Sequence, residues 1–193
     1  MDKKNIQALD FNDIWFIIYK LYKRIHDSSF DPEVIVGIAR GGYPVARIFC
    51  DLFGIGKVAM MGIEFYTGIN ETKEKPQVLY DVPIDIDDKR VLLVDDVADT
   101  GKSLELAKRH LEKKNIQTLK IATLHYKPQS IIKPDFYYEK TEDWIVYPWE
   151  MVEFTRDYVK KRKKEKIEVE QIIHELQEIA LPAIVIREVI QKE

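Results

Sequence analysis

Residues 91–103 read VLLVDDVADTGKS, and this stretch decides the fold. Its first four residues are aliphatic, a pattern typical of a strand buried inside a parallel sheet. Two adjacent carboxylates, Asp95 and Asp96, follow the strand, then a turn of small residues, and a helix is predicted from residue 101. Ligands bind at the carboxyl ends of strands in open α/β sheets, and helix N-termini attract phosphate. The stretch therefore predicts a phosphate site beside two acidic side chains.

Helices and strands alternate around this stretch. Helical periodicity covers residues 12–26, 44–53 and 101–114, while strand-like runs cover 34–39, 57–66, 91–94, 118–125, 136–138 and 144–147. The alternation predicts an α/β fold with a central parallel sheet flanked by helices. Residues 67–83 hold two prolines and few apolar residues, so we expect a long flexible loop in which 78–80 could form a short strand.

The C-terminal part has a different character. Residues 149–193 show helical patterns over 149–166, 169–179 and 182–192 and no strand signal. The segment is short for an independent domain. We therefore expect a core with a small hood over residues 1–148 and a helical appendage over residues 149–193.

Composition excludes several classes of protein. The formal net charge of −3 over 193 residues is too balanced for generic nucleic-acid binding, and the basic run KKRKKEK at 160–166 is predicted to be a solvated helix face. The single cysteine, Cys50, excludes an intramolecular disulfide or a CxxC motif. No apolar run suits a transmembrane helix or signal peptide. We expect a cytoplasmic protein without nucleic-acid or membrane partners.

The GKS triplet at residues 101–103 invites comparison with a P-loop ATPase. A Walker A motif needs glycine five residues before Gly101, and that position holds Asp96. The chain is therefore not expected to be a P-loop ATPase.

The hydrophobic strand, the acidic pair and the T-G-K-S turn resemble the phosphoribosyl-pyrophosphate (PRPP) signature of type I phosphoribosyltransferases. The resemblance extends from the first predicted helix to about Asp157, so the last 35 or so residues lie outside the usual family body. The resemblance implies the type I phosphoribosyltransferase fold and a pentosyltransferase that uses PRPP and Mg²⁺. It also implies a homodimer.

The resemblance assigns a role to each part of the motif. Asp95 and Asp96 would hold the ribose hydroxyls and organise Mg²⁺, and Asp99 would be the general base or acid near purine N7, unless it only caps the next helix. Lys102 replaces a small residue of the family, so it either contacts phosphate or points to solvent. The implied 5′-phosphate loop consists of Val97, Ala98, Asp99, Thr100, Gly101, Lys102 and Ser103.

A second loop, Arg40-Gly41-Gly42, resembles the pyrophosphate loop of the family. Glycine lets a backbone approach an anion closely, and arginine can bind phosphate through two hydrogen bonds. The family often has a non-proline cis peptide here, expected at Ala39–Arg40. The alternative is an ordinary strand-to-helix turn. Arg156 is a further candidate for pyrophosphate binding.

Residues 67–83 occupy the place of the mobile lid of the family, which shields PRPP from water. Tyr66 matches the tyrosine of the Ser-Tyr pair that precedes the lid. Phe65 stands in place of the serine and has no assigned role.

Lys127 and the segment DWIVYPWE at residues 143–150 resemble the base-binding hood of 6-oxopurine enzymes, notably the xanthine-guanine type. Lys127 would donate to O6, Trp144 would stack on the purine, and backbone groups of Ile145 would read its other edge. An ammonium group only donates, so it favours a carbonyl over an amino group. Alternatively, Lys127 is a solvated lysine and Trp144 a core residue, as we expect for Trp149.

Together these features predict an enzyme of purine salvage that transfers the 5-phosphoribosyl group from PRPP to N9 of a purine, with 6-oxopurines favoured. Two alternatives stay open. The appended helices could reshape the hood for adenine, or the chain could be a regulatory protein of the same fold that senses PRPP or nucleotide. The sequence does not decide the preferred purine, the oligomer or the role of residues 158–193.

Overall fold

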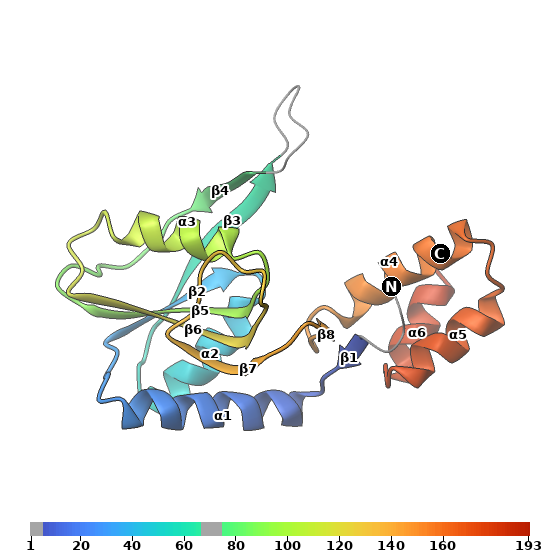
Figure 1. Ribbon diagram of the computed structural model, residues 1–193, viewed down its shortest axis with the longest axis horizontal. Helices are drawn as coiled ribbons and strands as arrows, with labels where there is room; N and C mark the ends of the chain where they lie inside the picture. The colour runs from blue at the N-terminus through green and yellow to red at the C-terminus, as the bar shows by residue number, and fades with distance from the viewer. Residues whose placement is uncertain (1–5, 67–74) are drawn as a thin grey trace. The chain divides into compact units, whose positions relative to one another are not determined.

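The computed structural model describes residues 6–66 and 75–193 (Figure 1). The chain forms two compact units, one from residues up to 14 together with 142–193, the other from residues 15–141. The units therefore do not divide at the predicted boundary of 148/149. The reason is that strand β1 (Ile6–Ala8) pairs in parallel with β8 (Trp144–Val146), which joins both ends of the chain in the smaller unit.

The larger unit is built on a six-stranded sheet of order β4-β3-β2-β5-β6-β7 within the described residues. Its strands are β2 (Val34–Ala39), β3 (Val58–Tyr66), β4 (Lys75–Tyr80), β5 (Arg90–Ala98), β6 (Thr118–Tyr126) and β7 (Phe136–Lys140). All neighbours are parallel except β3 and β4, which form an antiparallel edge. The expected parallel α/β sheet is confirmed.

The prediction of a loop over residues 67–83 is wrong for residues 75–80. These residues form β4, which is longer than the short strand considered at 78–80 and pairs with β3 from Gly62↔Tyr80 to Tyr66↔Lys75. Pro76 is tolerated because β4 lies at the edge of the sheet, where a missing N–H donor costs little. Residues 67–74 lie outside the described part of the chain.

Three helices accompany this sheet: α1 (Phe11–Asp27), α2 (Gly42–Phe53) and α3 (Lys102–Leu111). Figure 1 shows α3 on one face of the sheet and α1 and α2 on the other. Leu93 of β5 and Leu104 of α3 belong to one buried apolar cluster. All four residues of the run 91–94 are fully buried, as their aliphatic character predicts.

The smaller unit contains helices α4 (Met151–Lys164), α5 (Val169–Glu178) and α6 (Ala183–Ile190), so the three predicted C-terminal helices are confirmed. They bury an apolar cluster of their own that includes Val146, Val159 and Leu176. In the basic run 160–166 the lysines are exposed, as expected, whereas Arg162 bonds to the buried Glu175. No described helix is long and apolar enough to span a membrane.

Candidate active site

Asp95 and Asp96 lie near the carboxyl end of β5, which runs between β2 and β6. The N–H of Asp96 donates to Asp95 Oδ1 at 3.0 Å, and the N–H of Val97 donates to Asp96 Oδ1 at 2.8 Å. Asp95 is half-buried. Burial, and then the neighbouring charge of Asp96, raises the pKa of Asp95 well above its usual range.

The predicted phosphate loop is divided between a strand and a turn. Val97 and Ala98 continue β5 and pair with β6, so the turn itself is residues 99–101. Helix α3 begins at Lys102, with Gly101 as its N-cap at φ +77°. A Cβ at Gly101 would lie only 2.4 Å from Ser130 Oγ, so both the conformation and the space require glycine.

A cavity of about 490 Å³ opens at this turn. The residues that line it are Phe65, Asp95, Val97, Asp99, Thr100, Gly101, Lys102, Ser103 and Leu104. The cavity therefore combines a helix N-terminus, two hydroxyl side chains and a cation, the groups that bind a phosphate. Phe65, for which the sequence indicated no role, forms part of its wall, because β3 ends close to the turn. Both alternatives for the exposed Lys102 remain open.

The Arg40-Gly41-Gly42 loop packs directly against the acidic pair. A Cβ on Gly41 would lie 2.0 Å from Asp96 Oδ2, and a Cβ on Gly42 would lie 2.4 Å from the carbonyl oxygen of Val94. The peptide bond between Ala39 and Arg40 is cis, as the resemblance implied. The two glycines are therefore required by the close approach of α2 to the end of β5, which an ordinary strand-to-helix turn does not need.

The loop after β6 is hydrogen-bonded to the end of β5 and to the turn at residues 99–101, here called the phosphate turn. The N–H of Lys127 donates to the carbonyl of Ala98 at 3.0 Å, and the N–H of Ile131 donates to that of Thr100 at 3.0 Å. Lys127 is only 7% exposed, so the alternative of a solvated surface lysine is wrong. The structure thus brings Lys127, the phosphate turn, the acidic pair and the Arg40 loop to one edge of the sheet.

Asp99 does not cap α3, because Gly101 holds that position and no side chain caps it. The Asp99 carboxylate instead accepts a hydrogen bond through Oδ1 from Nε2 of Gln129, at 2.8 Å. Sequence reasoning missed Gln129, and no sequence signal could have found it, since its partner is 30 positions away. The capping alternative for Asp99 is therefore wrong.

His125 lies on β6, two residues before Lys127, and is 2% exposed. Burial, and then the positive charge of Lys127, lowers the pKa of His125 to about 4. The ring is therefore neutral near pH 7.

The remaining candidates belong to the smaller unit. Trp144 is 44% exposed, so the alternative of a core tryptophan is wrong, while Ile145 beside it is buried. Trp149 is half-buried and stacks on the buried Tyr147, with ring centroids 5.2 Å apart; its expected core role holds only in part. Arg156 lies on α4, and its Nε is 3.5 Å from Glu193 Oε1.

Tyr66 is the last residue of β3, directly before residues 67–74. The predicted lid lies partly on those residues, outside the described part of the chain. Its role stays a prediction.

The comparisons with known proteins agree with this geometry. A family model described as a phosphoribosyl transferase domain matches residues 7–155. A xanthine-guanine phosphoribosyltransferase of Idiomarina loihiensis is 30% identical over 119 residues, which cover 61% of this chain and 70% of that protein. A hypoxanthine-guanine phosphoribosyltransferase of Staphylococcus epidermidis is 31% identical over 133 residues, 66% of this chain and 72% of the relative.

Among solved structures, a purine phosphoribosyltransferase from Pyrococcus horikoshii is similar, with a TM-score of 0.68 and 35% identity. The similarity covers 75% of this chain and 93% of that one. The family match includes every element that carries the acidic pair, the two loops and Lys127. Both the matched length and the geometry of the site lead to the same conclusion: the chain belongs to the phosphoribosyltransferase family and has its type I fold.

Proposed function

We propose that this chain is a purine phosphoribosyltransferase that transfers the 5-phosphoribosyl group of PRPP to N9 of a 6-oxopurine. The products are a nucleoside 5′-monophosphate and pyrophosphate, so the reaction belongs to purine salvage. The observation that carries the proposal is the single sheet edge where the acidic pair, the phosphate turn, the Arg40 loop and Lys127 meet. The relatives named above act on xanthine, guanine and hypoxanthine, as their names state.

The site offers a separate place for each anionic or polar part of PRPP. The turn at Thr100 and Gly101, together with Ser103, would bind the 5′-phosphate through backbone N–H groups and hydroxyls at the N-terminus of α3. Asp95 and Asp96 would accept hydrogen bonds from the ribose hydroxyls. The Arg40 loop would bind the pyrophosphate, and the contact between Gly41 and Asp96 supports this placement next to the ribose.

Mg²⁺ fits the acidic pair when substrate supplies most of its ligands. Within the described residues, no group of three or more His, Cys, Asp or Glu side chains could hold a metal ion. Mg²⁺ commonly binds one or two carboxylates together with waters and substrate phosphates, and Asp95 and Asp96 supply such oxygens. When bound, the ion would neutralise charge on the pyrophosphate as it leaves.

The transfer forms one bond and breaks another at C1 of the ribose. The bond between C1 and N9 forms, while the C1–O bond breaks and its electron pair leaves with pyrophosphate. The purine then carries an excess proton at N7, which Asp99 would accept. General base catalysis of this kind is typically worth about 10²–10⁴-fold, and positioning and electrostatics would supply most of the rest.

Lys127 and Trp144 would select the base. The ammonium of Lys127 can only donate, so it suits the carbonyl at C6 of a 6-oxopurine. Trp144 offers an exposed ring for stacking, which tolerates different purines. The names of the relatives favour oxopurines, so neither adenine nor a purely regulatory role is favoured.

The test is an initial-rate assay with PRPP, Mg²⁺ and, separately, hypoxanthine, guanine, xanthine and adenine. We expect turnover with at least one oxopurine and none with adenine. Asp99→Asn is expected to lower kcat by about 10²-fold or more, because the acceptor of the N7 proton is weakened. Turnover of adenine alone would contradict the assignment of Lys127, and no turnover with any base would contradict the proposal.

Other parts of the proposal stay predictions. They are the lid role of Tyr66, the contact of Ile145 with the base and of Arg156 with pyrophosphate, the homodimer and the cytoplasmic location.

A further inference from the structure

Gln129 belongs to none of the motifs that the family resemblance assigned, yet it touches the proposed catalytic carboxylate. Its amide Nε2 donates to Asp99 Oδ1 at 2.8 Å. The other oxygen, Oδ2, has no hydrogen bond to any described residue. One oxygen of Asp99 is thus held by Gln129, and the other is left to accept a proton.

We infer that Gln129 is a positioning residue for the proposed reaction: its amide fixes the Asp99 carboxylate so that Oδ2 receives the N7 proton. The inference rests on the proposed function, because it needs Asp99 to act on the purine. A carboxylate on a short side chain rotates about two bonds, and a hydrogen bond to one oxygen selects among those orientations. Catalysis is sensitive to such orientation.

The loop that carries Gln129 is itself fixed to the phosphate turn. On one side of Gln129 the N–H of Lys127 bonds to Ala98, and on the other the N–H of Ile131 bonds to Thr100. Within the loop, the N–H of Ser130 donates to the carbonyl of Lys127 at 3.0 Å. The backbone on both sides of Gln129 is therefore held to the two residues that flank Asp99.

Residues of the same loop would determine the contacts to two neighbouring atoms of the base. O6 and N7 lie side by side on one edge of a 6-oxopurine. Lys127, the proposed donor to O6, is two positions before Gln129, which holds the proposed acceptor of the N7 proton. One short loop would thus set both contacts to this edge.

A merely structural role can be distinguished from positioning. Gln129 and Asp99 are both exposed, so their hydrogen bond is expected to add little to the stability of the fold. Loss of the bond should therefore appear in kcat and not in the free energy of unfolding.

The experiment is a double-mutant cycle on the full chain, with PRPP and the best oxopurine as substrates. Gln129→Met keeps the length of the side chain but removes the donor, and Gln129→Glu replaces the donor by a second carboxylate. We expect kcat to fall about tenfold for Gln129→Met and further for Gln129→Glu, with KM for PRPP within about twofold of the wild type. Gln177→Met, at an exposed site on α5, is the matched control and should leave kcat unchanged.

In the Asp99→Asn background, Gln129→Met should cause no further loss, because both changes remove the same oriented carboxylate. An unchanged kcat for both Gln129 variants, or a loss that multiplies with that of Asp99→Asn, would overturn the inference and leave the proposed function standing. A loss of unfolding free energy that accounts for the lower rate would also overturn it. Absence of turnover by the wild type with all four bases would instead overturn the proposed function and this inference with it.

Discussion

At the residue scale, two adjacent glycines differ in what surrounds them. A Cβ on Gly41 would meet the side-chain carboxylate of Asp96, whereas a Cβ on Gly42 would meet the backbone of β5 at the Val94 carbonyl, which the sheet holds in place. Gly41 has φ −65°, so alanine can adopt its backbone conformation. Substitutions at Gly41 and Gly42 therefore distinguish a change in the active site from a change in the stability of the fold.

Gly41→Ala is expected to lower kcat/KM for PRPP by about tenfold or more, because the new methyl group displaces the Asp96 carboxylate. The same substitution should lower the free energy of unfolding by less than about 1 kcal/mol. Gly42→Ala should cost about 1–3 kcal/mol, because α2 is forced off β5. Urea unfolding and initial rates measure both quantities. Gly56→Ala, where a Cβ meets nothing within 4 Å, is the control. Equal stability of Gly42→Ala and the wild type would show that the packing argument is wrong.

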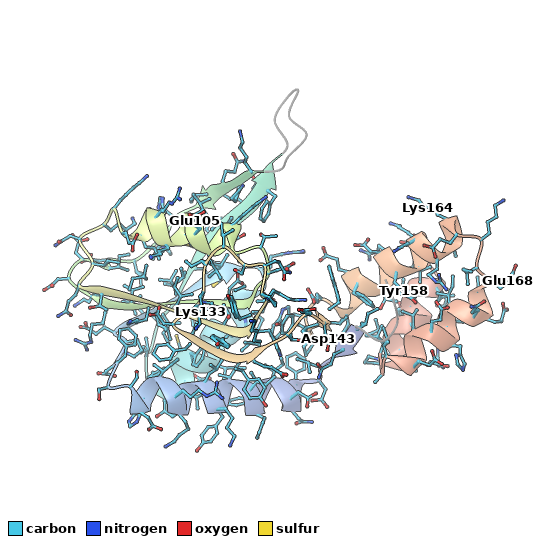
Figure 2. All side chains as sticks on the ribbon, viewed as in Figure 1. Glu105, Lys133, Asp143, Tyr158, Lys164 and Glu168 are labelled. Atoms are coloured by element: carbon cyan, nitrogen blue, oxygen red, sulfur yellow. The ribbon has the colours of Figure 1, made fainter. Side chains whose placement is uncertain are left out.

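At the scale of elements, an ion pair with a buried carboxylate joins α5 to α4. Glu175 is 1% exposed and accepts hydrogen bonds from Arg162 Nη2 at 2.6 Å, Arg162 Nε at 2.8 Å and the Tyr158 hydroxyl at 2.8 Å. Burial, and then the bond to Glu175, raises the pKa of Tyr158 to about 12. Figure 2 shows Tyr158 in the smaller unit, on the same helix as the outward-pointing Lys164.

Arg162→Met is expected to destabilise the smaller unit by about 3–5 kcal/mol, because it leaves the Glu175 carboxylate buried without its cation. Glu175→Met should cost less, since Arg162 is 23% exposed and can still reach water. The double variant should recover much of the loss. Amide hydrogen exchange in α4 and α5 measures these differences.

The control for the Arg162–Glu175 pair is an exposed ion pair on α3. Arg109 and Glu105 form an exposed ion pair with side-chain exposures of 69% and 38%, and Glu105 is labelled in Figure 2. Arg109→Met should change stability by less than about 1 kcal/mol. A loss for Arg162→Met no greater than for Arg109→Met would contradict the role assigned to the Arg162–Glu175 pair.

At the scale of the whole molecule, each unit buries its own apolar cluster, and the two clusters share no residue. Leu176→Ala should cost about 2–5 kcal/mol in the smaller unit. Native-state hydrogen exchange is expected to show lower protection in α4, α5 and α6 and unchanged protection in β2 and β5. Leu93→Ala should have the opposite pattern. A parallel loss of protection in both units for Leu176→Ala would mean that they unfold together.

Features that depend on local patterns could be predicted from the sequence alone. The aliphatic run before Asp95, the two glycines after Arg40 and the three C-terminal helices follow from hydrophobic periodicity and from residue types that only certain backbones accept. The phosphoribosyltransferase signature is likewise local, because strand, carboxylates and turn are consecutive. These features sufficed to predict the fold class and the edge that carries the site.

Contacts between distant parts of the chain could not be predicted in this way and are seen only in the folded structure. The pairing of Ile6 with Trp144, which moves the division between the units, and the bond from Gln129 to Asp99 join residues with no shared sequence pattern. Arg162 illustrates the same limit, since nothing in its basic run distinguishes the one cation that meets a buried carboxylate. Such contacts depend on how elements pack in space, and that packing is not encoded in the spacing of neighbouring residues.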